Sequence, residues 1–133
     1  EDALASLSGE NNPEKKTIDI KLAISAYISD DYIHEDRVRL ELYRRLSKAS
    51  DIQDIYKIEE EMEDRFGKPD IFTKQFIELI IIKILALNLG IQSISSYEMN
   101  ITFTKANDTK ETIKSPSKDD DDIIATTLRY LRK

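Results

Sequence analysis

Residues 70–90 read DIFTKQFIELIIIKILALNLG and contain the longest apolar run of the chain. Asp70 can cap the start of a helix there, and Gly90 can end it after about Leu89. Its apolar positions are Phe72, Phe76, Leu79, Ile80, Ile81, Ile82, Ile84, Leu85 and Leu87. They cover most of the helix circumference, which is typical of a central, buried helix. Lys83 interrupts the run, and the run is far shorter than the ~20 apolar residues that a membrane span needs, so we expect no membrane contact.

Two further helices are predicted before this segment. Val38, Leu42 and Leu46 lie at helical spacing, with acidic residues in the first turn and basic residues in the last. Ser50-Asp51-Ile52-Gln53 matches a capping box, so a second helix should begin at once. Gly67 is a natural residue to end it. The short connection makes the two helices antiparallel neighbours.

Strands are predicted on both sides of the helices. Apolar and polar residues alternate over residues 17–24 and again over residues 97–103, as in half-buried strands. Asn107-Asp108 supplies turn chemistry, after which residues 111–114 can return as a partner strand. A last amphipathic helix follows Asp119-Asp120-Asp121-Asp122. The order of strand, three helices, hairpin and helix predicts an α+β fold. It should be a small antiparallel sheet packed against a bundle of three to four helices, with one central buried helix.

The length of 133 residues fits one domain. Residues 1–16 contain a Gly-Glu-Asn-Asn-Pro cluster and are predicted to be a linker and the tail of a preceding region. Residues 17–133 should form the domain itself. The N-terminus resembles no signal peptide, so we expect a cytoplasmic piece of a longer protein.

Composition and motifs favour a domain without catalysis. The chain has no cysteine and three glycines. A thiol nucleophile and a cysteine-bound metal are therefore excluded, and no glycine-rich phosphate loop exists, because Pro69 follows the one Gly67-Lys68 pair. His34 is the only histidine and is expected to be a capping or solvated group. The aspartates 119–122 lack the pattern of a calcium loop and are expected to serve as a helix cap and acidic first turn. We predict no catalytic, cofactor or metal site.

The two helices of the predicted hairpin carry opposite charge. Residues 37–48 hold five bases and one acid, whereas residues 51–64 hold seven acids and one base. Pairing within the hairpin can use only part of this acidic excess. Glu61 and Asp64 share a helix face at i and i+3, and we interpret that face as a candidate for an arginine-bearing partner. The alternative is a nucleic-acid contact through Arg37, Arg39, Arg44 and Arg45, which the net charge of −6 argues against.

Three segments in register resemble a known family. They are DRVRLELYRRL at residues 36–46, EEEMEDRFG at residues 59–67 and LALNLGI at residues 85–91. They are similar, in order and spacing, to motifs of the C-terminal (TRCF) domain of the bacterial transcription-repair coupling factors, and the similarity covers about residues 17–103.

The resemblance implies a specific role. Proteins of that family use an ATP- and magnesium-dependent DNA translocase to remove stalled RNA polymerase, and they recruit the repair protein UvrA. Their C-terminal domain carries no ATPase motif and packs on the UvrA-binding module of the same protein, which keeps the protein autoinhibited. By position, the implied interface is Glu61 and Asp64, flanked by Glu60 and Arg65. Direct nucleic-acid binding by this domain is not expected.

Overall fold

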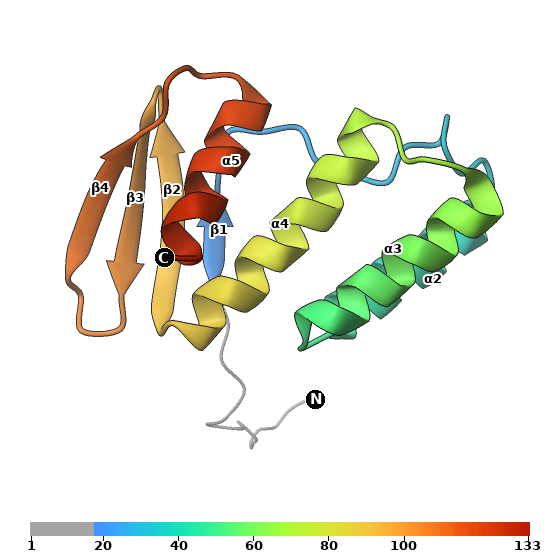
Figure 1. Cartoon of the computed structure of the whole chain (residues 1–133), viewed down its shortest axis with the longest axis horizontal. Coiled ribbons are helices and arrows are strands. Elements are labelled where there is room, and N and C mark those ends of the chain that lie inside the picture. The colour runs from blue at the N-terminus through green and yellow to red at the C-terminus, as the bar shows by residue number, and fades with distance from the viewer. Residues whose placement is uncertain (1–17) are drawn as a thin grey trace, which may run out of the picture.

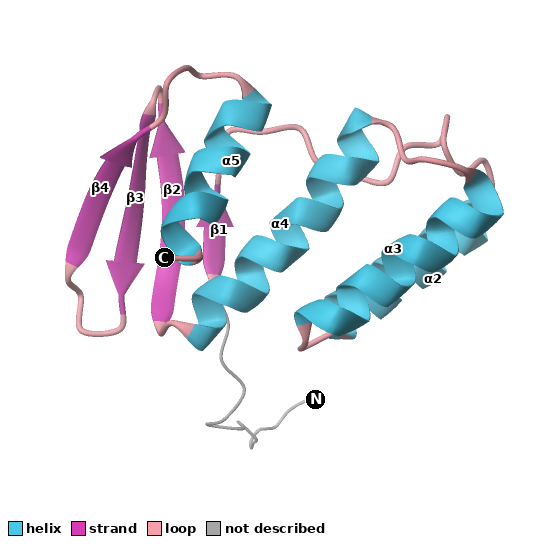
Figure 2. Ribbon diagram, viewed as in Figure 1, coloured by secondary structure: helices cyan, strands magenta, loops and turns pink. Residues whose placement is uncertain are grey.

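The computed structural model describes residues 18–133, and the predicted linker over residues 1–16 lies outside them. Along residues 18–133, one strand is followed by three helices, three strands and a last helix (Figures 1 and 2). In order, they are β1 (Asp19–Lys21), α2 (Asp36–Lys48), α3 (Ile52–Phe66), α4 (Ile71–Asn88), β2 (Ile91–Tyr97), β3 (Asn100–Lys105), β4 (Lys110–Lys114) and α5 (Asp120–Leu131). The predicted α+β class is confirmed.

The sheet is mixed, in contrast to the antiparallel sheet that was predicted. Its strand order is β1-β2-β3-β4, and the two later pairings are antiparallel. β1 pairs with β2 in parallel, with Ile20 opposite Ile94. The cause lies in the connection, because three helices separate these two strands and a long crossover permits parallel pairing.

The strand predicted over residues 97–103 is confirmed for residues 100–103, which lie in β3, but its predicted start at Tyr97 is wrong. The chain turns at Glu98 and Met99, where Glu98 has a φ of 58°, so Tyr97 ends β2 and pairs with Asn100 of β3. Because this turn has two residues, the alternation of apolar and polar residues continues across it, and the sequence pattern does not mark the boundary between β2 and β3. β2 itself was missed because its register shifts between Ile91 and Ser93, which disrupts the expected alternation.

The helix predictions are confirmed, with one correction at a cap. The cap of α3 is Asp51 rather than Ser50, because the Asp51 side chain accepts a hydrogen bond from the Gln53 N–H at 3.0 Å. Asp70 caps α4 as predicted, accepting from the Thr73 N–H at 2.9 Å. Gly67 ends α3 at a φ of 86°, which only glycine adopts without strain.

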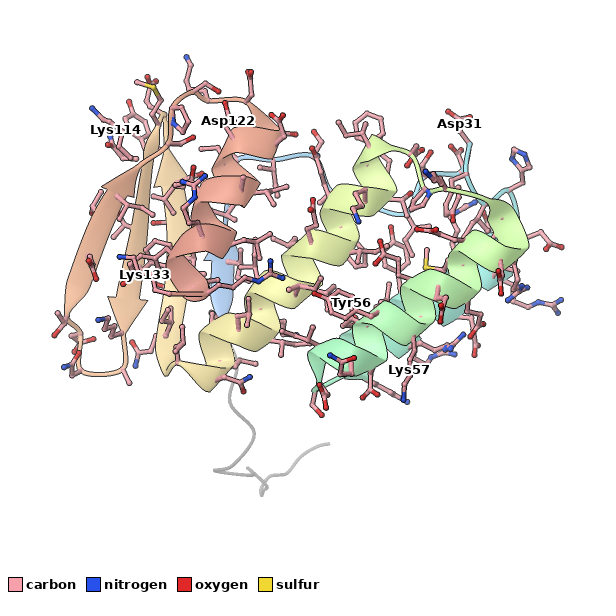
Figure 3. The ribbon with its side chains drawn as sticks, viewed as in Figure 1. Asp31, Tyr56, Lys57, Lys114, Asp122 and Lys133 are labelled. Carbon is pink, nitrogen blue, oxygen red and sulfur yellow. The ribbon has the colours of Figure 1, made fainter. Side chains whose placement is uncertain are left out.

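α4 separates two clusters of buried side chains. Ile77 packs with α2 and α3 on one side, while Ile82 packs with the sheet and α5 on the other, and both are fully buried. Figure 3 shows Tyr56 lying between α3 and α4, and its hydroxyl oxygen is 3.3 Å from a guanidinium nitrogen of Arg132, beyond the end of α5. The prediction of a central buried helix is confirmed. Within residues 18–133, no helix is long and apolar enough to span a membrane.

Candidate functional site: the acidic face of α3

An ion-paired carboxylate lies at the seam between α2 and α3. Arg45 of α2 donates from both terminal nitrogens to Glu61 of α3, at 2.7 and 2.8 Å. Arg65, one turn further along α3, brings a third nitrogen to 3.8 Å from the same carboxylate. The hydrogen bonds with Arg45 lower the pKa of Glu61 and raise the pKa of Arg45. Glu61 therefore already forms an ion pair between α2 and α3. Residue spacing along α3 alone could not predict this contact.

This pair should contribute a modest, pH-dependent part of the stability. A double-mutant cycle compares the original chain with Arg45→Ala, Glu61→Gln and the double variant. It should give a coupling free energy of roughly 0.5–1 kcal/mol at neutral pH, since both side chains are about a third or more exposed. The folded pKa of Glu61 lies below its ordinary 4.5. The coupling should thus be fully present above that pH and shrink as the pH falls through the folded value.

Urea unfolding of the four proteins at several pH values measures this coupling. The exposed Arg44–Glu41 pair, 3.3 Å apart on one helix, is the control and should give a smaller coupling at neutral pH. A coupling between Arg45 and Glu61 that grows in acid would contradict the assignment.

Three other carboxylates of α3 point outward and form what we call the acidic face: Glu60, Glu63 and Asp64. All three are exposed, and no cation of residues 18–133 lies within 4.0 Å of any of them. Their spacing of i, i+3 and i+4 puts them on one side of the helix. Glu59, by contrast, turns toward α4, where Lys74 donates to it at 2.9 Å, a bond that raises the pKa of Lys74. Of the four interface residues predicted from sequence, the structure places Glu60 and Asp64 on the acidic face and Glu61 and Arg65 beside it.

Tyr32 anchors the end of α3 next to the acidic face. Its hydroxyl lies 2.6 Å from the Gly67 carbonyl oxygen, to which it donates, and its ring meets Phe66 edge-on at 6.0 Å. Burial, reinforced by the charge of Glu63, raises the pKa of Tyr32 to about 12. No sequence pattern marks this residue, because Tyr32 lies in an irregular segment without periodicity.

The arginines of α2 do not form a free basic stripe. Arg39 donates to the Ile33 carbonyl oxygen at 2.5 Å and pairs with Asp36. Arg44 and Arg45 are each paired with a glutamate, as described above. Arg37 alone of the four has no acid within 4.0 Å among the described residues. These contacts leave little of the charge that a nucleic-acid contact through α2 would need.

The other polar residues singled out from sequence lie elsewhere. His34 is exposed in the short irregular segment before α2, whose N-cap is Glu35. Asp119 caps α5 without a side-chain bond, and the next three aspartates form its acidic first turn, as predicted. Oxygen atoms of Asp119, Asp121 and Asp122 lie within 4.8 Å of one another. Asp122 also accepts a hydrogen bond from the Ser117 hydroxyl at 2.7 Å, so part of this acidic group serves local structure.

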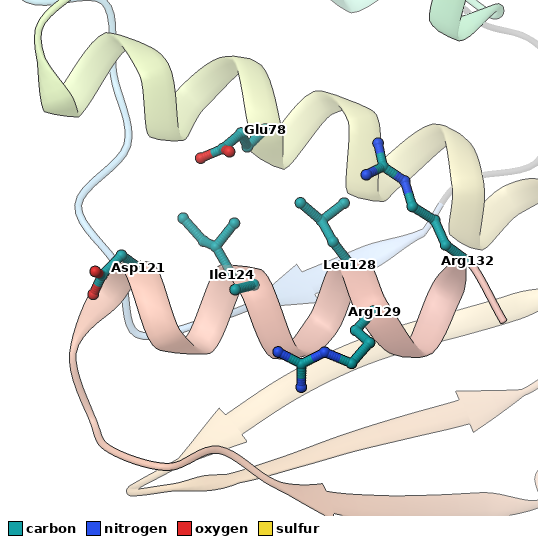
Figure 4. Close-up of a pocket in the computed structure, with 7 residues that line it drawn as sticks. Glu78, Asp121, Ile124, Leu128, Arg129 and Arg132 are labelled. Atoms are coloured by element: carbon teal, nitrogen blue, oxygen red, sulfur yellow. The ribbon is translucent and has the colours of Figure 1, made fainter.

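A groove of about 350 Å³ runs between α4 and α5. In Figure 4, Glu78 of α4 and Arg132 from the end of α5 flank it, and Ile124 and Leu128 point into it. Burial raises the pKa of Glu78. Asp121, the other carboxylate of the lining, lies at the far end of the groove beyond Ile124. The groove thus has an apolar floor, and its charged side chains lie far apart along it. This arrangement is typical of the boundary between two packed helices.

Comparisons of sequence and of structure with known proteins point to the same family. The family model described as the TRCF domain matches residues 22–115. The chain is 45% identical over 131 residues to a Transcription-repair-coupling factor of Helicobacter pylori strain J99, which covers 98% of this chain and 13% of that protein. A Staphylococcus epidermidis protein of the same name is 27% identical over 85 residues, covering 64% of this chain and 7% of its own length. A crystal structure of the C-terminal domain of a transcription-repair coupling factor matches at a TM-score of 0.63 and 25% identity, over 67% of this chain and 55% of that one.

Proposed function

This chain belongs to the TRCF domain family of transcription-repair-coupling factors, and on that premise we propose that it is a regulatory module without catalytic activity. It spans 13% of the length of its Helicobacter pylori relative. In the proposal, the parent protein is a cytoplasmic, ATP-dependent DNA translocase that acts in transcription-coupled repair. This module packs on the UvrA-binding module of the same protein and masks it.

The observation that carries the proposal is the charge of the acidic face, which no cation of residues 18–133 approaches within 4.0 Å. Glu60, Glu63 and Asp64 stand together on an exposed helix side, although the neighbouring helix offers five bases. Within the described part of the chain, these carboxylates therefore form no ion pair that stabilises the fold. Carboxylates in such an array can hold arginines of a partner through paired hydrogen bonds.

The mechanism is competition between the module and UvrA for one surface. Each partly buried arginine–carboxylate pair contributes on the order of 1–3 kcal/mol. Two such pairs give a closure of roughly 3 kcal/mol, which leaves under about 1% of the molecules open. Polymerase and DNA would open the protein by binding the open form better. ATP and magnesium belong to the translocase region, and this module needs no cofactor and makes no direct nucleic-acid contact.

A capture experiment tests the proposal. The 133-residue chain is immobilised and presented with the N-terminal part of the parent protein, with and without UvrA. We expect retention of the N-terminal part and its release by UvrA in a dose-dependent way. Simultaneous retention of both proteins would contradict the masking mechanism.

A further inference from the structure

A second feature of the α2–α3 seam is a hollow lined by three arginines. It has a volume of about 200 Å³ and lies between the start of α2 and the end of α3. Its lining residues are Arg37, Val38, Glu41, Leu42, Arg45 and Arg65. The floor is apolar, because Leu42 is buried and Val38 is half-buried. Such a floor lowers the local dielectric and strengthens hydrogen bonds made above it.

The arginines of this hollow retain unused donors. Arg45 commits two N–H groups to Glu61 and keeps three of its five. Arg65 lies over the Phe66 ring at 4.8 Å and is 3.8 Å from Glu61, beyond hydrogen-bond distance. Arg37 makes no ion pair within residues 18–133. The one carboxylate of the lining, Glu41, is paired with Arg44.

We propose that this arginine hollow is a seat for a single side-chain carboxylate of a docking partner. Planar guanidinium groups match a carboxylate in geometry and bind it through two hydrogen bonds. The hollow is positive, yet the acidic face begins beside it, since Asp64 directly precedes Arg65 along α3. A polyanion such as DNA would be repelled by that face. The fitting partner is therefore a segment of mixed charge, whose carboxylate enters the hollow while its arginines meet the acidic face.

This inference deepens the proposed function and rests on it only for the identity of the partner, the UvrA-binding module. The seat itself follows from the lining, the free donors and the neighbouring charge. The seat requires that the partner carry a carboxylate in addition to arginines. The acidic face alone makes no such requirement, and a partner with arginines only would leave the hollow unfilled.

The test is a titration of the 133-residue chain with N-acetyl-glutamate amide, followed by NMR of the arginine Nε–H groups. The signals of Arg37 and Arg65 should shift, and Arg37→Ala should weaken binding by about threefold or more. Lys48→Ala is the matched control, since it removes one exposed base from the same helix outside the hollow. It should weaken binding by less than about 1.5-fold through the general field.

Two further titrations use inorganic phosphate and a short DNA duplex. The carboxylate should bind at least as well as phosphate at the hollow, and the duplex should not shift these signals. Equal effects of the two variants, or a response to phosphate or DNA alone, would overturn the seat. Those results would not contradict the masking function that the capture experiment tests. A failed capture would likewise not contradict carboxylate binding in the hollow, so the two proposals can fail separately.

Discussion

Reversing two charges of the acidic face, Glu60→Arg with Asp64→Arg, should raise UvrA binding by the full-length parent protein about tenfold or more in the absence of stalled polymerase. Both residues are exposed and have no cation within 4.0 Å among the described residues. Each reversal replaces an attraction for a partner arginine by a repulsion. Loss of roughly 1.4 kcal/mol of closure free energy increases the open fraction tenfold.

The control for this prediction is Asp30→Arg with Asp31→Arg. These exposed acids lie in the turn before α2, outside the acidic face, and give the same change in net charge. They should leave basal UvrA binding within about twofold. Both double variants of the 133-residue chain should keep the melting temperature of the original within a few degrees. Equal UvrA binding by the two full-length variants would contradict the role of the acidic face.

Replacing Phe103 by alanine should lower the free energy of unfolding by about 3–5 kcal/mol. The side chain is 0% exposed in the cluster between the sheet and α5. Its ring stacks on Tyr130 of α5 at 3.9 Å between centroids. Truncation would remove both the buried area and the surface that orients α5 on the sheet.

Urea unfolding of the 133-residue chain measures this loss, with Tyr97→Ala as the control. Tyr97 lies on the adjacent strand but is 77% exposed, so its removal should cost less than about 1 kcal/mol. Similar losses for the two variants would show that α5 does not pack on the sheet through Phe103.

The helices were predictable because their signals are local. Asp70 and Gly67 mark their ends by cap chemistry, and the apolar circumference of α4 marks it as central. The sheet was less predictable, because β1 reaches β2 across three helices and no local pattern decides its direction. The register shift after Ile91 breaks the alternation that marks a strand, whereas the turn at Glu98 hides a strand boundary, because the alternation continues across it.

The candidate site was predictable in kind rather than in detail. Charge counting identified an acidic excess on α3, and helical spacing placed Asp64 on an outward side. Neither charge counting nor helical spacing reveals that Glu61 pairs with Arg45 of α2, because that contact depends on how the two helices are rotated against each other. The arginine hollow needs the same knowledge, since its lining comes from both helices.

A calorimetric titration measures whether the acidic face binds the UvrA-binding module. The 133-residue chain is titrated with the purified module, once as it stands and once as Asp64→Arg. We expect binding by the original chain and a dissociation constant raised at least about tenfold in the variant, as for loss of one well-made arginine–carboxylate pair. The same dissociation constant for both proteins would contradict binding through the acidic face.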